Sequence, residues 1–543
     1  MKTRYLVTAA SSLVYLLLSC PAMALEGEPY IHDPSNIMEC DGKYYTFGTG
    51  GGGLISEDGW TWNGGAVRPG GGAAPDALKI GDRYLVAYSA TGGGLGGGHN
   101  GRILTMWNKT LDPNSPDFEY TQAIEVASSD GEEDCDAIDV GLLLDPTTGR
   151  LWATYGTYFG NIRVVELDPK TGARVEGNEA VDIAIDCEAT TMIYRDGWYY
   201  LLGTHGTCCS GANSTYNIRV GRSKSPTGPF LDHTGMDMLR GGGKLVVAAN
   251  GRYIGPGHFG LIDLGDDVQK FSCHYEADLD RGGRSILDIR ALLWKDGWPV
   301  AGDNFLGGTF QIESARSGYS LEIGVESTPL AQGRVRMMAA PGGGAPRGGA
   351  PAAAPGDGAP RRGAAPDGAA PRGGAPAAAP GDGAPRRGAA PGGMGMGMGG
   401  RNSGPATPIP DQDVAEVSAN WPSDTVVARL GDYMLQAHQK WSIEPVAEAG
   451  GYLGSPYFRI IIAGTERALT ATADGEVVVE PSFTGGDAQL WRIDQLIDGS
   501  YRIMPKMETS MGPMALTAVG VSTPSLAKFD ADSVDGRWNL RKP

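Results

Sequence analysis

The stretch D-C-E-A-T-T-M-I-Y-R-D-G-W-Y-Y-L-L-G-T, residues 186–204, holds the pattern that decides the fold of the first half of the chain. An apolar run rich in β-formers leads into Asp196-Gly197, and an aromatic run follows. Asp-Gly between two such runs is a strong signal for a two-residue hairpin turn. The stretch therefore predicts two antiparallel strands, with Glu188 near the start of the first.

A glycine turn followed by an aromatic-rich strand returns at intervals of some 40 to 70 residues. The turn glycines are Gly42, Gly81, Gly149, Gly197 and Gly251. Regular return of one hairpin signal is typical of repeat architectures, and helix-period segments are scarce. Five such units predict an all-β five-bladed β-propeller, in which four-stranded sheets surround a channel. An all-β sandwich is the alternative, but it does not account for the regular return.

Three carboxylates occupy matching places in three of these units. Asp33 precedes its turn glycine by nine residues, Asp139 by ten and Glu188 by nine. In a propeller the strand before such a hairpin lies nearest the axis, so equivalent positions converge at one end of the channel. Each acid alone is explained by a turn at a strand end. Aligned in register, the three predict an acidic site.

Paired carboxylates are the groups that glycoside hydrolysis requires. One is protonated and serves the leaving oxygen, and the other is ionised and acts as base or nucleophile. A third carboxylate nearby raises the pKa of the acid through like-charge repulsion. The three carboxylates can therefore supply a general acid, a base and a third group that raises the pKa of the general acid.

The length and the net charge of the chain limit the functions that it can have. The chain has 543 residues, a formal net charge of −18 and a pI near 4.9. This length exceeds one compact core and predicts roughly two to four domains. The acidic balance argues against nucleic acid as a partner and favours an uncharged substrate. No motif predicts an organic cofactor, and the oligomeric state is not readable.

Residues 1–24 have the order of a secretory signal peptide: basic residues, the short apolar run 13–18, and small residues ending at Ala24. The run is too short to span a bilayer, and no other segment is apolar enough. We therefore expect a secreted protein, extracellular or periplasmic, with no membrane span. The alternative is a lipoprotein acylated at Cys20.

The other six cysteines can form disulfides in an oxidising compartment. They are Cys40, Cys135, Cys187, Cys208, Cys209 and Cys273. The sequence does not give their pairing, and the adjacent Cys208 and Cys209 cannot pair with one another without backbone strain. No C-x-x-C pair is present, which argues against a structural zinc site.

At the acidic residues the chain resembles glycoside hydrolase family 43, above all its endo-1,5-α-L-arabinanases. The matching segments run in order through the first domain: I-H-D-P-S-N-I (31–37), A-I-D-V-G-L-L-L-D (137–145), C-E-A-T-T-M-I-Y-R-D-G-W-Y-Y (187–200), C-C-S-G-A-N-S-T-Y (208–216), G-P-G-H (255–258) and L-D-I-R-A-L-L-W-K-D-G-W-P-V (287–300). The resemblance implies a five-bladed propeller and an inverting mechanism.

The resemblance also implies roles for these residues. Asp33 would be the general base that activates water, Glu188 the general acid, and Asp139 the residue that raises the pKa of the acid and orients it. Substrate contacts would come from Asp76, Tyr158, Phe159, Asn161 and His258, although buried strand packing explains Tyr158 and Phe159 equally well. His274 would face an axial Ca²⁺ held mostly through water, although a buried core histidine explains it equally well.

The chain departs from the family in its second unit. Ala73 stands in A-A-P-D where the family usually has Trp, and the following loop, residues 91–100, is glycine-rich. An aromatic platform for a sugar ring is therefore expected to be missing there. The departures leave the acids intact but leave open the polymer and the choice between endo and exo action.

After residue 306 a threefold pattern resembles the ricin-type β-trefoil. Trp441, Trp491 and Trp538 lie 50 and 47 residues apart and close similar strand signals, and Gln precedes the first two by two positions. We expect these Trp residues in a core. The domains are then a propeller at 25–306 and a trefoil at 307–543, interrupted by a Gly/Ala/Pro/Arg-rich insertion at about 340–408. Such composition predicts disorder.

Three functions follow as hypotheses. The first is a secreted inverting hydrolase of α-L-arabinofuranosyl linkages, with α-1,5-arabinan of plant cell walls as its substrate. The second is an arabinofuranosidase or β-xylosidase acting on other hemicellulose. The third is a carbohydrate-binding protein without activity, against which the retention of all three acids argues.

Overall fold

The computed structural model describes residues 25–91, 100–130, 134–325, 414–510 and 512–543. The predicted signal peptide, Cys20 and the low-complexity insertion lie outside these residues. Within them the α-helical content is the short α2 (Val414–Ser418), and no described helix is long and apolar enough to cross a membrane. Strands make up nearly all the rest, which confirms the all-β prediction.

Five antiparallel sheets follow one another along the first half of the chain. Blade 1 holds β2 (Met38–Cys40), β3 (Lys43–Phe47), β4 (Gly52–Ser56) and β5 (Thr61–Val67), and β1 (Glu26–Gly27) pairs with β5 in parallel. Blade 2 holds β6 (Ala73–Ile80), β7 (Arg83–Thr91), β8 (Gly101–Asn108) and β9 (Ile124–Ser128). Blade 3 holds β10 (Gly141–Leu144), β11 (Leu151–Tyr155), β12 (Asn161–Leu167) and β13 (Val181–Ile185).

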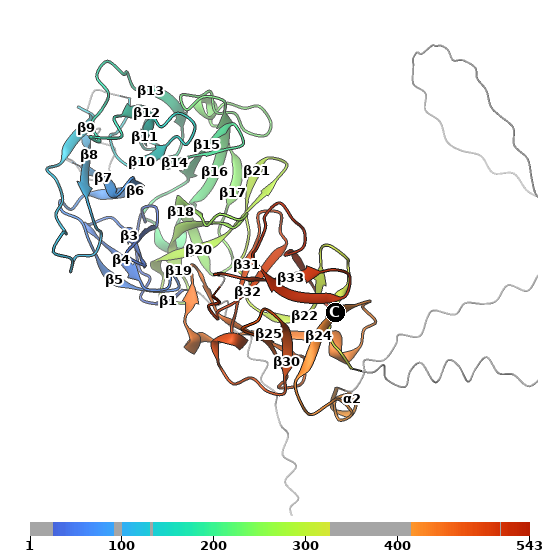
Figure 1. The fold of residues 1–543 in the computed structure, drawn as a ribbon. Helices are drawn as coiled ribbons and strands as arrows, with labels where there is room; N and C mark the ends of the chain where they lie inside the picture. Colours follow the sequence, from blue (N-terminus) through green and yellow to red (C-terminus); the bar gives the residue numbers. More distant parts are fainter. Residues whose placement is uncertain (1–24, 92–99, 131–133, 326–413, 511) are drawn as a thin grey trace, which may run out of the picture. The chain divides into compact units, whose positions relative to one another are not determined.

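The last two blades have the same order. Blade 4 holds β14 (Glu188–Arg195), β15 (Trp198–His205), β16 (Asn217–Ser223) and β17 (Lys244–Val247). Blade 5 holds β18 (Tyr253–Asp263), β19 (Gln269–Asp278), β20 (Arg284–Lys295) and β21 (Trp298–Ala301). The first strands of successive blades, from β2 to β18, contact one another in turn around a common centre (Figure 1). The prediction of a five-bladed propeller is confirmed.

Blades 1 and 5 close the ring through hydrogen bonds between the ends of the domain. The amide of Leu287 donates to the carbonyl of Pro29 at 2.8 Å, and the hydroxyl of Ser285 donates to the carbonyl of Ile31 at 2.7 Å. A buried apolar cluster that includes Ile31 and Leu287 joins the same two blades. Closure therefore brings residues near position 30 beside residues near position 280.

The Asp196-Gly197 turn has the predicted geometry. Asp196 (φ 50°) and Gly197 (φ 77°) are both left-handed, and they join Arg195 directly to its strand partner Trp198. This is the backbone of a two-residue hairpin whose twist matches that of the strands. The glycine turns of blades 1 to 3 likewise link the first two strands. Gly251 differs, because it precedes β18 and so lies before the innermost strand of blade 5.

The second half of the chain builds a closed barrel of six strands. The closed pairing order is β22 (Gly308–Ser314), β25 (Trp441–Pro445), β28 (Phe458–Ile462), β31 (Trp491–Gln495), β32 (Tyr501–Pro505) and β35 (Trp538–Arg541). Three further hairpins accompany it: β23 (Ser320–Ile323) with β24 (Val426–Gly431), β29 (Ala468–Ala471) with β30 (Val477–Glu480), and β33 (Ala515–Val519) with β34 (Thr523–Ala527). A short pair, β26 (Gly451–Tyr452) and β27 (Ser455–Pro456), completes the strands. Six barrel strands with three hairpins form a β-trefoil, as predicted.

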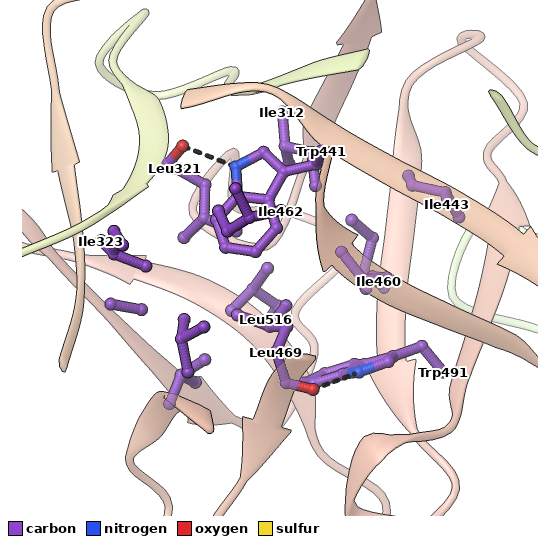
Figure 2. Packing of buried hydrophobic residues seen from close by; sticks show 14 of the residues in the cluster. Ile312, Leu321, Ile323, Trp441, Ile443, Ile460, Ile462, Leu469, Trp491 and Leu516 are labelled. Atoms are coloured by element: carbon purple, nitrogen blue, oxygen red, sulfur yellow. Dashed lines mark hydrogen bonds between the residues drawn. The ribbon is translucent and has the colours of Figure 1, made fainter. Parts of the chain in front are cut away.

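The three repeated tryptophans form the centre of the trefoil core. Trp441, Trp491 and Trp538 are each fully buried at the first position of a barrel strand. Figure 2 shows Trp441 and Trp491 among Ile and Leu side chains, with each indole N–H donating to a carbonyl of a neighbouring hairpin strand. Trp538 makes the equivalent bond to the carbonyl of Leu516 at 2.8 Å. The prediction that these residues are core is confirmed.

The predicted insertion is flanked by two strands of one hairpin. β23 ends at Ile323, β24 begins at Val426, and Ile323 pairs with Ala428. The chain on either side of the low-complexity residues therefore belongs to the first trefoil repeat. The predicted domain boundary at 306 falls between β21 and β22.

Replacing Trp491 with Ala should lower the free energy of unfolding of the trefoil by about 3–5 kcal/mol, because it leaves a cavity and an unpaired carbonyl at Leu469. Chemical denaturation followed by circular dichroism measures the change. Val427, a trefoil residue that is 61% exposed, serves as control, and Val427→Ala should stay within about 0.5 kcal/mol of the wild type. Equal effects of the two substitutions would contradict a core role for Trp491.

Candidate active site

One cavity of about 430 Å³ draws lining residues from all five blades. Asp33, Ala73, Asp139, Glu188 and Glu276 come from blades 1 to 5 in that order. All three acids predicted from the sequence therefore face one space. A cavity of this size accommodates a sugar residue and its neighbours.

The backbone at the cavity has one unusual residue in every blade. Asp33, Ala74, Asp139, Ala189 and His258 have φ values of 53°, 42°, 58°, 47° and 61°. Non-glycine residues seldom adopt this left-handed conformation, and they concentrate at functional sites. In blades 2, 4 and 5 the strand register also shifts at this position. Of these five residues, Asp33 and Asp139 line the cavity and precede β2 and β10, whereas His258 lies within β18.

Asp33 lies among two imidazoles and a hydroxyl. Nδ1 of His32 is 2.9 Å from Oδ2, Thr49 donates its hydroxyl to the same oxygen at 2.6 Å, and Nδ1 of His258 lies 3.6 Å from Oδ1. Burial favours the protonated form of Asp33, but His258 and the charge of His32 outweigh it and hold the pKa well below its usual value. Asp33 is therefore ionised.

Glu188 has the opposite ionisation. It is buried, and burial raises its pKa to about 8. The hydroxyl of Tyr216 donates to Oε1 and acts against the rise, while the negative charge of Asp33 adds to it. Glu188 therefore carries a proton at neutral pH, as a general acid must.

Asp139 is the third acid of the cavity. Burial, and then the charges of Glu188 and Asp33, raise its pKa well above the usual value. Its Oδ2 accepts a hydrogen bond of 3.1 Å from the amide of Ala189, the residue that follows Glu188. Burial, Asp33 and Glu276 raise the pKa of Glu188, and Asp139 is not among these causes, so the predicted effect of Asp139 on the pKa of the acid finds no support here; the charge of Glu188 instead raises the pKa of Asp139. Its contact with Ala189 suits the predicted orienting role.

The predicted substrate contacts divide into two groups. Tyr158 and Phe159 line the cavity, with ring centroids 4.5 Å apart, and Phe159 is 45% exposed. Asn161 does not line it, because its amide donates to Asp134 and Asp182. His258 is buried behind Asp33 and also has no surface on the cavity.

Asp76 requires a correction. Its carboxylate is buried and accepts from the amides of Asn36 (3.0 Å), Ala77 (2.8 Å) and Leu142 (2.8 Å), and it does not line the cavity. These partners belong to three blades. We therefore assign Asp76 a structural role, tying blades 1, 2 and 3 together, in place of the predicted substrate contact.

His274 is fully buried beside the base. Its Nδ1 accepts from the amide of Asp33 at 3.3 Å, and its Nε2, which makes no hydrogen bond to a described residue, lies 3.8 Å from Oε1 of Glu276. His32, Asp33 and His274 place one ligand-type atom each within 4.8 Å of one another. Two imidazoles and one carboxylate do not match the six to eight oxygens that Ca²⁺ prefers. The axial Ca²⁺ stays a prediction, and no catalytic step is derived through it.

Sequence reasoning missed the groups that surround the acids. His32 bridges two carboxylates, with Nε2 3.0 Å from Oε1 of Glu276. Burial favours neutral His32, but Asp33 and Glu276 outweigh burial and raise its pKa to about 10. The hydroxyl of Thr49 donates a hydrogen bond to Asp33, and the hydroxyl of Tyr216 donates one to Glu188. Tyr216 ends the quoted C-C-S-G-A-N-S-T-Y segment, but nothing local marks its partner.

The cysteine prediction is also corrected. Within the described residues the disulfide joins the adjacent Cys208 and Cys209, and both line the cavity. Cys209 has a φ of 59°, so the pairing comes with the unusual backbone that adjacency predicts. Cys40, Cys187 and Cys273 are buried in the propeller without disulfides.

A propeller cavity that holds one protonated and one ionised carboxylate defines a glycoside hydrolase. The sequence model of glycosyl hydrolases family 43 matches residues 46–299. The chain is 30% identical over 326 residues to the extracellular exo-α-(1→5)-L-arabinofuranosidase ArbA of Cellvibrio japonicus, covering 54% of this chain and 90% of that protein. The chain therefore belongs to glycosyl hydrolases family 43.

Two further proteins and a second family model also match the chain. The extracellular endo-α-(1→5)-L-arabinanase 1 of Bacillus subtilis is 32% identical over 236 residues, which is 42% of this chain and 67% of that protein. An exo-1,5-α-L-arabinanase from a bovine ruminal metagenomic library has a solved structure that is 32% identical, with a TM-score of 0.46, covering 50% of this chain and 97% of that one. The model of the ricin-type β-trefoil lectin domain-like family matches residues 437–517.

Activity should fall as the pH rises through about 8, because that is where Glu188 loses its proton. The enzyme is active when Glu188 is protonated, so the raised pKa of Glu188 keeps it active up to a higher pH. Above that pKa, kcat/KM should fall about tenfold per pH unit. A profile measured from pH 5 to 10 checks this.

Tyr216→Phe is the matched variant for the profile. It removes the hydrogen bond that stabilises ionised Glu188, so the alkaline limb should move to higher pH. An alkaline limb near the pKa of an ordinary glutamate, or one that Tyr216→Phe leaves in place, would contradict the assignment of Glu188 as the acid.

Proposed function

We propose that this chain is an exported enzyme that hydrolyses α-1,5-linked L-arabinofuranosyl residues of arabinan with inversion at the anomeric carbon. The observation that carries the proposal is the unequal protonation of Glu188 and Asp33 in one cavity. The choice of linkage is supported by the names of the relatives, which act on α-(1→5)-linked arabinose polymers.

The residues have distinct roles in the proposed reaction. Glu188 gives its proton to the glycosidic oxygen as the bond to the anomeric carbon breaks. Asp33 takes a proton from the water that attacks this carbon from the opposite face. Thr49 and His32 hold the Asp33 carboxylate, and Asp139 holds the backbone beside Glu188.

The cavity wall supports a compact sugar ring as the ligand. Ala73 lines the cavity, and no aromatic residue of blade 2 lines it among the residues that the structure describes. The Tyr158–Phe159 pair of blade 3 lines the same cavity and offers an aromatic surface instead. The sugar ring is proposed to rest on this pair while the acids act on its linkage.

Purified protein with linear arabinan should release arabinose or short oligomers, and Glu188→Gln should lower kcat by at least about a hundredfold, because the leaving oxygen loses its proton donor. Product sizes separate the modes: mixed oligomers from early time points indicate endo action, and a single small product indicates exo action. Chromatography of the products measures both.

Matched substrates test the alternatives. Nitrophenyl arabinofuranoside, nitrophenyl xyloside and arabinoxylan address the arabinofuranosidase and β-xylosidase hypotheses. Release from one of these without attack on arabinan would replace the proposed substrate. Binding of arabinan by both wild type and Glu188→Gln with no product from either would leave a binding protein and overturn the enzymatic proposal.

The trefoil is proposed to bind polysaccharide and hold the enzyme near its polymer. Its match to a lectin-like family supports this role, and tethering raises the local concentration of linkages. Gln439 and Gln489 are not proposed to bind sugar. Their side-chain amides donate hydrogen bonds to Glu322 and Glu480 within the domain.

Export with cleavage after Ala24 is proposed from the first 24 residues and from the extracellular relatives. The intact mass of the mature protein should correspond to an N-terminus at Leu25. A mass that includes acylated Cys20 at the N-terminus would show lipoprotein anchoring instead.

A further inference from the structure

A disulfide lies in the wall of the catalytic cavity and has no part in the reaction proposed above. Cys208 and Cys209 lie between β15 and β16, just before the short 3₁₀ turn η1 (Gly211–Asn213). Both cysteines line the cavity with the three acids. A cross-link between adjacent residues fixes one local backbone shape and closes no long loop, so its effect falls on its immediate neighbours.

The disulfide begins a chain of contacts that ends at the base. The amide of Cys209 donates to Oε1 of Glu276 at 3.1 Å. The same oxygen lies 3.0 Å from Nε2 of His32, and Nδ1 of His32 lies 2.9 Å from Oδ2 of Asp33. Three short contacts therefore connect the cross-linked backbone to the carboxylate that activates water.

The cross-link lies where several blades meet. The two sulfurs, a ring nitrogen of His32 and a carboxylate oxygen of Glu276 all lie within 4.8 Å of one another. The hydroxyl of Tyr158 in blade 3 interacts with the backbone of Cys208. The disulfide of blade 4 thus contacts residues of blades 1, 3 and 5 around the cavity.

The loop conformation depends on something that holds it. Cys209 has a φ of 59°, which an L residue other than Gly, Asn or Asp rarely adopts alone. In this conformation its amide donates to Oε1 of Glu276. Ser214, farther along the loop, packs so closely on blade 5 that a Cβ at Gly255 would approach its hydroxyl to 2.5 Å. The far end of the loop is thus fixed by packing and the near end by the disulfide.

We propose that the Cys208–Cys209 disulfide is a positioning element for catalysis: it holds the amide of Cys209 against Glu276, which fixes His32 and through it the base Asp33. The inference rests on the proposed function. Opening the disulfide with a dithiol consumes two electrons and two protons, yields two cysteine thiols, and converts the dithiol to its cyclic disulfide. The freed loop relaxes, Glu276 loses a donor, and the base is no longer held in place.

The test compares oxidised and dithiothreitol-treated full-length protein on linear arabinan, after the oxidised enzyme has been shown to be active. Reduction should lower kcat roughly tenfold, as expected for the loss of one hydrogen bond to a charged group, and leave KM within about twofold. Re-oxidation should restore kcat. Alkylation and mass spectrometry of the peptide containing residues 208 and 209 should count no labels before reduction and two after it.

Two variants complete the test. Cys208→Ser/Cys209→Ser should show the lowered kcat from the start and no response to dithiothreitol, with a thermal melt confirming that it folds. Asn213→Ala changes an exposed residue of the same loop and should keep both the wild-type kcat and the sensitivity to dithiothreitol.

Three outcomes would overturn the proposal. Two alkyl labels on the native peptide would mean that the disulfide is absent. An unchanged kcat after complete reduction would mean that the loop needs no cross-link. A raised KM with unchanged kcat would make the disulfide a wall for the sugar and not a support for the base. An oxidised enzyme without activity on any substrate would instead count against the proposed function.

Discussion

Carboxylates that share one buried cavity cannot all be ionised, and this constraint organises the centre of the propeller. Asp33 keeps its charge because two imidazoles adjoin it. Glu188 and Asp139, buried beside that charge, keep their protons. Fixed positive and negative groups thus force unequal protonation on acids of similar intrinsic pKa, and unequal protonation is what acid–base cleavage of a glycosidic bond requires.

The backbone supplies this arrangement by repetition. Each blade contributes one left-handed residue in or shortly before its innermost strand. This residue is an aspartate in blades 1 and 3, an alanine in blades 2 and 4, and a histidine in blade 5. Asp76, one blade away from the base, joins three blades through backbone amides. These hydrogen bonds join the blades that carry Asp33 and Asp139.

The trefoil repeat could be predicted from the sequence because the residues that recur in it are core residues. The spacing of Trp441, Trp491 and Trp538 predicted three equivalent units, and each indole is buried and bonded to the matching hairpin. The propeller repeat was less regular, because Gly251 precedes the innermost strand of its blade where the other turn glycines follow it. A glycine turn can also lie between two blades, as Gly251 does between β17 and β18.

The sequence by itself determined four of the five blade hairpins, the threefold Trp pattern and the three acids, because turn chemistry, strand alternation and repeat spacing are local properties of the chain. The tertiary structure alone decided the partners of those acids, the structural role of Asp76 and the pairing of Cys208 with Cys209. His32 and Glu276 are 244 positions apart, and Tyr216 lies 28 positions from Glu188. The first pair meets only when blades 1 and 5 close the ring, and the second meets when blade 4 folds; no local pattern records either event.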